Sequence, residues 1–343
     1  MDFENNNLSN KGINFWSFIY LRREYDIDLL IRKFKEKDKI ALARLISIIE
    51  NHPEKASDIF KNFNHIKHDS YIIGITGSPG VGKSTLTGAI AKRLLKEGKS
   101  IGVISVDPTS PFSGGAFLGD RVRMTEVSLD PNIFIRSLAS RGYRGGISRA
   151  VLDITLLYEA FGMDFIIIET VGVGQSEFEI YNLAYTIIVV MVPGYGDAIQ
   201  MQKAGIIEIG DIYDVNKKDL GGADIAAHID MMLDDSTFQG GWRPPIVQTN
   251  SITGDGVDEL IENIWDHKEH IELSDLLSEK KKIRFAYKIK ELLYYKIDIV
   301  LESLINQDEL NHITTKALEN KFQIYDLVHD LFSDVKFERK SKS

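Results

Sequence analysis

The sequence predicts an α/β fold in which a doubly wound, mostly parallel sheet carries helical extensions at both ends. Short apolar runs alternate with amphipathic segments from Tyr71 to about residue 272, which is typical of strands joined by crossover helices. The apolar runs are nearly continuous, as in strands buried on both faces. A glycine-rich stretch, Gly77-x-x-x-x-Gly82-Lys83-Ser84, separates the first run from the first helical segment. Together these features indicate a P-loop NTPase.

The predicted elements follow one another in the order that a parallel sheet requires. Strands are expected at Ile72–Thr76, Ser100–Val106, Ile133–Ser137, Phe165–Glu169, Thr186–Val192, Ile212–Asn216 and Ile246–Asn250. Helices are expected at Lys83–Glu97, Gly119–Leu129, Ile147–Phe161, Ile199–Ile209, Ala223–Leu233 and Val257–Glu272. Ligands of such sheets bind at the carboxyl ends of the strands, and the polar motifs described below fall at those ends.

Helical patterns precede and follow the sheet region. Apolar residues between Asn14 and Phe63 recur at three- and four-residue spacings, Pro53 marks a break, and Ala56–Phe63 is expected to form a further short helix. Ser274–Leu304 is expected to form one long helix or two. Its apolar stripe can be buried against the same chain or against a second subunit, and we favour a homodimer. The predicted division is a helical N-terminal extension (1–66), a P-loop GTPase domain (67–272) and a C-terminal helical dimerisation arm (273–343).

Composition narrows the function classes. The chain has 343 residues, of which 43% are hydrophobic and 27% charged, as in an ordinary globular protein. A net charge of −9 argues against a nucleic-acid-binding surface. No apolar run reaches the length of a membrane span and no signal peptide or import presequence is visible, so we expect a cytoplasmic protein without a membrane partner. The absence of cysteine excludes disulfides and thiolate metal sites, and the pairs His65/His68 and His267/His270 are interpreted as solvated.

The glycine-rich stretch lies between a predicted strand and a predicted helix, which is the context of a phosphate-binding loop. Its glycines let backbone N–H groups and the positive helix end face phosphate oxygens. Lys83 is expected to reach the β- and γ-phosphates, and the Ser84 hydroxyl to ligate Mg²⁺. The residues expected to contact the nucleotide here are Gly77, Ser78, Pro79, Gly80, Val81, Gly82, Lys83, Ser84 and Thr85.

Three carboxylates are candidate Mg²⁺ ligands together with Ser84. Asp107 ends the second predicted strand, and Asp120 follows in a Gly-, Ser- and Pro-rich segment of the kind that orders around a γ-phosphate in nucleotide switches. Glu169 closes the fourth strand, at the position of the Walker B acid. The alternatives are a strand-end turn for Asp107, a helix cap for Asp120 and an ordinary strand-end residue for Glu169.

The predicted catalytic residues combine charge neutralisation, metal binding and water positioning. Gln175 lies in the loop after Glu169 and is a candidate for orienting the attacking water. The set is Lys83, Asp107, Glu169 and Gln175.

The segment Asn216-Lys217-Lys218-Asp219 ends the sixth strand and predicts guanine recognition. The Asp219 carboxylate can accept from guanine N1–H and the exocyclic amine, Asn216 can buttress the loop, and the Lys217 stem can lie over the ring. Adenine has no matching donors, so a buried carboxylate would be left unpaired. The residues Asn250, Ser251 and Ile252, after the next strand, are expected to complete the base pocket. The predicted reaction is Mg²⁺-dependent hydrolysis of GTP to GDP and phosphate.

With these motifs, the chain resembles the methylmalonyl-CoA mutase-associated GTPases (MeaB/ArgK/MMAA type, within the SIMIBI class of P-loop GTPases) over about residues 25–300. The most specific stretches are Gly77-Ser-Pro-Gly-Val-Gly-Lys-Ser-Thr85, Ser105-Val-Asp-Pro-Thr-Ser-Pro-Phe-Ser-Gly-Gly115, Leu118-Gly-Asp-Arg-Val-Arg-Met124, Glu169-Thr-Val-Gly-Val-Gly-Gln-Ser-Glu177 and Val192-Pro-Gly-Tyr-Gly-Asp-Ala-Ile-Gln200. The resemblance implies a homodimer built through the C-terminal helices and a chaperone role. That role is gating of adenosylcobalamin loading into a B12-dependent acyl-CoA mutase, and protection of that mutase.

The sequence departs from this family at several positions and leaves alternatives open. Lys218 stands where the family usually has Ala, which is expected to change little, and Ala198, Ile199, Met201 and Gln202 depart from the usual third switch, which contacts the mutase. Methylmalonyl-, isobutyryl- and ethylmalonyl-CoA mutase are all candidate partners. The alternative functions are an ATP-dependent kinase accessory to lysine/arginine/ornithine transport and a GTP-timed regulatory switch for another partner.

Overall fold

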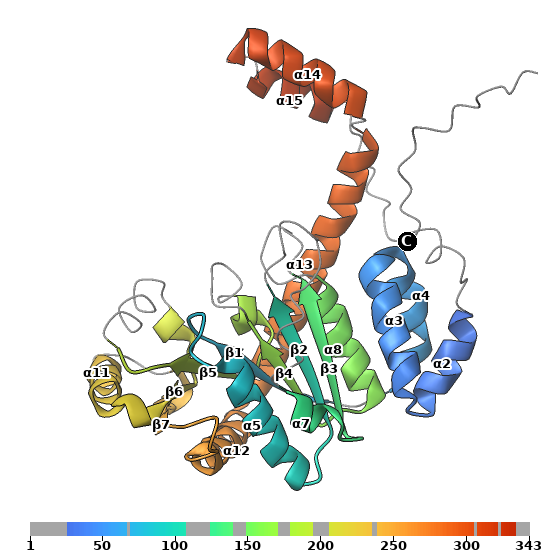
Figure 1. Cartoon of the computed structure of the whole chain (residues 1–343). Coiled ribbons are helices and arrows are strands. Elements are labelled where there is room, and N and C mark those ends of the chain that lie inside the picture. Colours follow the sequence, from blue (N-terminus) through green and yellow to red (C-terminus); the bar gives the residue numbers. More distant parts are fainter. Residues whose placement is uncertain are drawn as a thin grey trace, which may run out of the picture. The chain divides into compact units, whose positions relative to one another are not determined.

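The computed structural model describes residues 26–66, 69–107, 124–139, 149–170, 179–194, 206–234, 239–304, 307–321 and 324–333. The chain divides into two compact units, Met1–Phe285 and Ala286–Ser343, so the boundary falls inside a helix. Their elements are labelled in Figure 1.

A parallel sheet forms the core of the first unit (Figure 1), which confirms the predicted α/β fold class. Its seven strands are β1 (Tyr71–Thr76), β2 (Ile101–Asp107), β3 (Ile133–Ala139), β4 (Phe165–Glu169), β5 (Thr186–Met191), β6 (Ile212–Val215) and β7 (Ile246–Gln248). Their order is β3-β2-β4-β1-β5-β6-β7, and every neighbouring pair is parallel. All residues of β1, β4 and β5 are buried, as their continuous apolar sequences predict.

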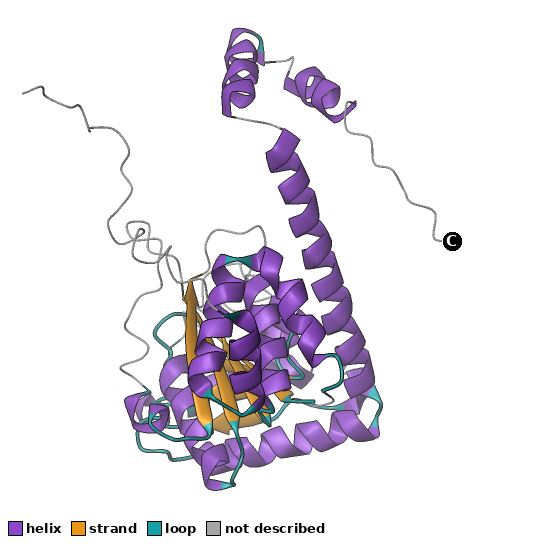
Figure 2. Cartoon of the chain, turned by 90° about the vertical axis from the view of Figure 1, so that its right-hand side faces the viewer, coloured by secondary structure: helices purple, strands orange, loops and turns teal. Residues whose placement is uncertain are grey.

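Helices cover the sheet on both faces (Figure 2). Because the β1-to-β2 and β3-to-β4 steps run in opposite directions, right-handed crossovers place their helices on opposite faces. These helices are α5 (Lys83–Lys96) and α8 (Arg149–Phe161). The helix α12 (Val257–Leu273) contacts α5, and α11 (Ala223–Asp234) contacts β7. The helix α5 follows β1, which is the central strand, so α5 begins at the carboxyl end of the middle of the sheet.

Three N-terminal helices, α2 (Ile27–Lys35), α3 (Lys39–Asn51) and α4 (Ala56–Phe60), belong to the first unit. The Asp26 and Asp38 side chains cap α2 and α3 by accepting from free backbone N–H groups of the first turns. The Phe34 ring lies 5.1 Å from the Phe161 ring of α8, and Lys39 donates to the backbone oxygen of Ile133 at 2.6 Å. The helix α2 therefore packs on α8, and α3 packs on α8 and at the start of β3.

Several elements differ in length from the sequence prediction. The predicted helix Ala56–Phe63 ends at Phe60 and continues as a 3₁₀ turn. In place of the predicted helices Gly119–Leu129 and Ile199–Ile209, the structure describes the short helix α7 (Thr125–Ser128) and a 3₁₀ turn, Ile206–Ile209. Residues 119–123 and 199–205 lie outside the described residues. The strand β7 ends two residues early because Asn250 pairs antiparallel with Asp255 in a turn.

A buried polar network fixes α12 and the start of α13 (Leu276–Leu304) at the amino ends of the strands. His267 is 2% exposed, so its interpretation as a solvated residue was wrong. Its Nδ1 lies 2.8 Å from Thr186 Oγ1 and its Nε2 3.3 Å from Asp211 Oδ1. Burial would raise the pKa of Asp211, but Lys280 and His267 hold that pKa below its usual range. A sequence signal existed, because position 267 continues the buried stripe of Leu260, Ile264 and Ile271.

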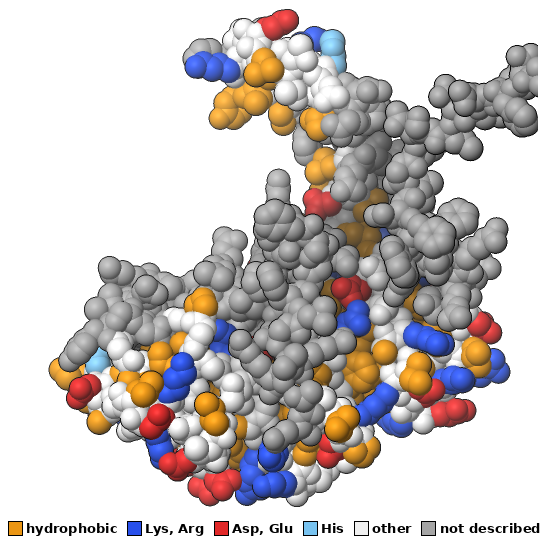
Figure 3. All heavy atoms as spheres, viewed as in Figure 1, with side chains coloured by type: hydrophobic (Ala, Val, Ile, Leu, Met, Phe, Trp, Pro, Cys, Tyr) orange, Lys and Arg blue, Asp and Glu red, His pale blue; other side chains and the backbone are white. Residues whose placement is uncertain are grey.

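The second unit contains the rest of α13, followed by α14 (Gln307–Glu319) and α15 (Ile324–Ser333). The predicted apolar stripe of α13 is exposed: Ile289 and Leu293 have 58% and 57% of their surface accessible. Figure 3 shows further apolar side chains gathered on one side of α14 and α15. The exposed large apolar residues of these two helices include Leu310, Ile324 and Val328. Burial of this surface in a homodimer stays a prediction.

Candidate nucleotide-binding site

The glycine-rich loop between β1 and α5 has a backbone shape that requires glycine at two of its positions. Gly77 has φ +143°, and a Cβ on it would lie 2.2 Å from the backbone oxygen of Val190 in β5. Gly82 has φ +101°, and a Cβ there would lie 2.5 Å from Nδ2 of Asn216. Neither position has room for a side chain, so the loop closes tightly against β5 and Asn216.

Lys83 begins α5 and lies across the loop that precedes it. Its Nζ donates to the backbone oxygens of Gly77 at 2.7 Å and Ser78 at 3.0 Å. Within the described residues, no side chain caps the N-terminus of α5 by a hydrogen bond. The N–H groups of that first turn, the positive end of the helix and the Lys83 ammonium therefore converge on one loop, which is the arrangement that binds phosphate.

Glu169 forms a buried oxygen cluster with hydroxyl groups of two other elements. The Ser84 hydroxyl donates to Glu169 Oε1 at 2.5 Å, and the Thr87 and Ser105 hydroxyls lie 3.4 Å and 3.5 Å from Oε2. Hydroxyl and carboxylate oxygens are the ligands that Mg²⁺ prefers, so the donor set fits that ion. Thr87 and Ser105 were missed by sequence reasoning. Thr87 lies one turn after Lys83 in α5, and Ser105 pairs directly with Glu169 in the sheet.

The side chains of three further residues that the sequence assigns to metal binding or catalysis lie outside the described part of the chain. Asp107 ends β2, two residues beyond Ser105, but its side chain is outside the described part of the chain. Asp120 and Gln175 also lie outside the described residues. Their roles in metal binding and catalysis stay predictions.

Asn216 links the phosphate loop to the loop that follows β7. Its Nδ2 donates to the backbone oxygen of Val81 at 2.8 Å, and its Oδ1 accepts from the Ser251 hydroxyl at 2.7 Å and the Ser251 N–H at 3.1 Å. Lys217 adopts a left-handed conformation with φ +57°, and its Nζ donates to the backbone oxygen of Gly80 at 3.0 Å. The segment predicted to bind guanine is thus fastened to the segment predicted to bind phosphate.

Asp219 and the turn after β7 lie beside this junction. Asp219 is exposed, and its Oδ1 accepts from Nδ2 of Asn250 at 2.8 Å. Ile252, predicted to contact the base, is 86% exposed at the tip of the turn. The described residues assigned to phosphate, metal and base therefore all come from the carboxyl edge of the sheet, as expected for a parallel sheet.

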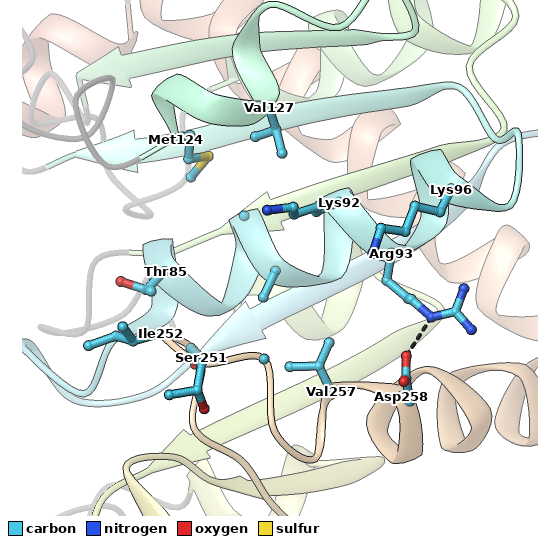
Figure 4. A pocket seen from close by; sticks show the side chains of 14 residues that line it. Thr85, Lys92, Arg93, Lys96, Met124, Val127, Ser251, Ile252, Val257 and Asp258 are labelled. Carbon is cyan, nitrogen blue, oxygen red and sulfur yellow. Dashed lines mark hydrogen bonds and ion pairs between the residues drawn. The ribbon is translucent and has the colours of Figure 1, made fainter.

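A cavity of about 560 Å³ continues from this edge along α5 (Figure 4). Thr85 and Ile252 line one end, and the other end carries Lys96 and the ion pair between Arg93 and Asp258. The cavity thus joins predicted nucleotide contacts to a surface with several basic side chains.

The strand β6, which leads into the Asn216–Asp219 segment, contains a buried acidic residue that the sequence analysis did not single out. Asp214 of β6 is fully buried, two residues before Asn216, and neither carboxyl oxygen has a hydrogen-bond partner among the described residues. Burial raises the pKa of Asp214 to about 7, and the nearby Thr249 hydroxyl offsets part of this effect. A single acidic residue in an apolar strand, Ile-Tyr-Asp-Val, was the available sequence signal.

A family model described as methylmalonyl Co-A mutase-associated GTPase MeaB matches residues 42–306. The chain belongs to this family of GTPases. A relative from Pyrococcus abyssi that bears the name of a GTPase is 42% identical over 313 residues, which cover 90% of this chain and 97% of the relative. The GTPase ArgK of Escherichia coli is 32% identical over 258 residues, covering 73% of this chain and 78% of ArgK.

Two further similarities bear on the function of this MeaB-family chain. The mouse methylmalonic aciduria type A homolog, a mitochondrial protein, is 33% identical over 260 residues, covering 74% of this chain and 59% of the mouse protein. The crystal structure of an LAO/AO transport system kinase aligns with a TM-score of 0.66 and 25% identity, covering 91% of this chain and 98% of the kinase. Among the described residues, none of the helices is long and apolar enough to cross a bilayer.

Proposed function

We propose that this MeaB-family GTPase uses Mg²⁺-dependent GTP hydrolysis to gate adenosylcobalamin loading of a B12-dependent acyl-CoA mutase of the methylmalonyl-CoA mutase type, and to protect that mutase. The observation that carries the proposal is the meeting of the Lys83 loop, the Ser84–Glu169 contact and the Asn216–Asp219 segment at one edge of the sheet.

The reaction is phosphoryl transfer to water, for which positioning and charge stabilisation are the main demands. Lys83 neutralises β- and γ-phosphate charge. Ser84 and Glu169, with Asp107 and Asp120, would hold Mg²⁺, which when bound neutralises charge on the phosphate oxygens. Gln175 orients the water. The position of Glu169 supports this assignment, because its carboxylate is 5% exposed and lies against the Ser84 hydroxyl, which puts two oxygen ligands of the kind that Mg²⁺ prefers side by side.

Guanine specificity rests on Asp219, whose two carboxylate oxygens match the two donors on the guanine edge. Asn216 and Ser251 support the loops around the base, as their shared hydrogen bonds suggest. The Lys217 side chain runs from this segment to Gly80, on the path a nucleotide between the two loops would take.

The partner assignment rests on the family description, which names methylmalonyl Co-A mutase, and on the mouse relative, named for methylmalonic aciduria. The exposed apolar stripe on α13 supports a homodimer that buries it. A cytoplasmic location belongs to the same proposal. Loading of methylmalonyl-, isobutyryl- and ethylmalonyl-CoA mutases with adenosylcobalamin, each measured with and without the GTP-bound chain, tests which of them is the partner.

A second candidate function is an ATP-dependent kinase accessory to lysine/arginine/ornithine transport, because the chain aligns with the LAO/AO transport system kinase structure. The donor pattern expected at Asp219 disfavours ATP. Calorimetric titration of GDP and ADP with Mg²⁺ into the wild type and Asp219→Ala separates the two. GDP binding that is lost in the variant, without ADP binding, supports the GTPase. ADP binding that is insensitive to Asp219 would favour the kinase.

A further inference from the structure

Two side-chain contacts join the Asn216–Asp219 segment to the turn Asn250–Asp255. Asn250 Nδ2 donates to Asp219 Oδ1 at 2.8 Å, and Lys218 Nζ lies 2.5 Å from Asp255 Oδ2. We call this pair of contacts the clasp. It connects the two loops on which base recognition depends, in addition to the Asn216–Ser251 hydrogen bonds.

The Asn250 amide is itself held rigidly by its own turn. Its Oδ1 accepts from the N–H groups of Ile252 at 3.1 Å and Thr253 at 3.2 Å, and its backbone N–H donates to Asp255 at 2.9 Å. These two acceptor contacts identify Oδ1 within the amide, so Nδ2 points away from the turn. Because the amide is planar, fixing Oδ1 also fixes the position of Nδ2, which faces Asp219.

Asp219 depends on this contact for its orientation. The residue is exposed, and in the part of the chain that the structure describes its hydrogen-bond partner is Asn250. A carboxylate that accepts two parallel hydrogen bonds from guanine must lie close to the plane of the base. Oδ1 has two lone pairs, so it can accept from Asn250 and from a guanine donor together. The contact with Asn250 therefore restricts rotation of the Asp219 carboxylate, and both carboxylate oxygens can still accept hydrogen bonds from guanine.

Lys218, the residue before Asp219, also helps to fix the position of Asp219 relative to the turn Asn250–Asp255. Its N–H donates to the backbone oxygen of Thr249 at 3.0 Å, and its ammonium reaches Asp255 in the turn. The side chain does not need to face the base, as expected from the sequence, but it ties the segment that carries Asp219 to the turn that carries Asn250. An ion pair whose side chains are 33% and 61% exposed contributes little to global stability, so its effect is local.

We propose that Asn250 and Lys218 are positioning residues for base recognition: the clasp sets the Asp219 carboxylate in the plane that guanine requires before the nucleotide binds. This inference rests on the guanine-binding function proposed above. It predicts that the clasp governs discrimination of guanine from hypoxanthine, which lacks the exocyclic amine and therefore offers Asp219 one donor instead of two.

The test is calorimetric titration of GDP and IDP, with Mg²⁺, into the full chain and its variants, with thermal unfolding as a check of folding. The wild type should prefer GDP. Asn250→Ala should reduce the GDP/IDP affinity ratio by about two- to tenfold, less than for a buried hydrogen bond to a charged group because the Asp219 carboxylate is exposed. Lys218→Ala should reduce it by about two- to fivefold, the range of an exposed ion pair.

A matched control is the ion pair between Lys281 and Asp69, at 2.7 Å with side chains 30% and 79% exposed. Lys281→Ala should leave the GDP/IDP ratio unchanged. Charge exchange gives a rescue: Lys218→Glu lowers the ratio, and Lys218→Glu combined with Asp255→Lys restores it.

Equal losses of GDP and IDP affinity in a folded Asn250→Ala variant would overturn the inference, because they would mean that the contact merely supports the turn. Unchanged affinities for both nucleotides would overturn it as well. In either case, a wild type that prefers GDP would leave the proposed guanine function standing. A wild-type chain that binds neither nucleotide would refute the guanine function and the inference together.

Discussion

The Ser84 hydroxyl donates to the Glu169 carboxylate at 2.5 Å, and this contact joins the first turn of α5 to the last residue of β4. The two residues are 85 positions apart in the sequence. They come together because β4 lies beside β1, from whose carboxyl end the loop leads into α5. The contact brings a hydroxyl and a buried acid to the point where the proposed Mg²⁺ would neutralise phosphate charge.

Glu169→Gln keeps the shape of this side chain but removes its charge. We expect Mg²⁺-dependent GTP turnover to fall by about 100-fold or more, the scale of losing one electrostatic group at a phosphoryl-transfer site. Steady-state phosphate release at several Mg²⁺ concentrations measures this. Thr87→Ala, which removes the longer 3.4 Å contact to Glu169, should have the smaller effect. Full turnover by Glu169→Gln would exclude the acid from catalysis.

Gly82→Ala tests the closed shape of the phosphate loop. The new Cβ would lie 2.5 Å from Asn216 Nδ2, and the left-handed backbone disfavours alanine, so the Asn216–Val81 hydrogen bond should be lost. GDP affinity should fall by at least about tenfold, since strain and a lost hydrogen bond each contribute about 1 kcal/mol. Gly88→Ala is the control, because its Cβ would meet Met124 at an ordinary 3.8 Å. Equal GDP affinity in both variants would contradict the tight-loop account.

Asp219→Asn exchanges one acceptor of the predicted base contact for a donor. Xanthine carries an oxygen where guanine has the exocyclic amine, so the variant should bind XDP better than GDP, whereas the wild type should bind GDP better. Competition between the two nucleotides at equal Mg²⁺ measures the reversal. A variant that keeps its preference for GDP would show that Asp219 does not contact the base edge.

Asp214→Val tests the buried acid of β6. The folded-state pKa of about 7 lies above the usual value of 3.8, so the folded chain binds the extra proton between these values and stability falls as pH rises from about 4 to about 7. The variant should lose this pH dependence. At pH 8 it should be more stable than the wild type by up to about 4 kcal/mol, at about 1.4 kcal/mol per pKa unit. Urea unfolding at pH 5.5 and pH 8 measures both, and a pH dependence that persists in the variant would assign it to another group.

Much of the fold could be predicted because it is encoded locally. Continuous apolar runs identified the strands, and β4 was found with its bounds, Phe165–Glu169. The errors lie where a local signal is weak. The predicted Ile246–Asn250 strand extended too far because Asn250 has the polarity of a strand end, while its pairing with Asp255 depends on the turn that follows. His267 was taken as solvated because its immediate neighbours are polar, although its partners belong to β5 and to the turn before β6.

The sequence by itself determined the class of fold, the phosphate loop and the segment predicted to recognise guanine, because each depends on residue types and spacings within one short stretch. Only the tertiary structure decided which hydroxyls surround Glu169, that Asp214 is buried with no hydrogen-bond partner in the described part of the chain, and that Asn250 and Lys218 clasp the base loops. Such contacts join residues tens of positions apart, and they exist only once strand order and register bring the ends of separate strands to one edge of the sheet.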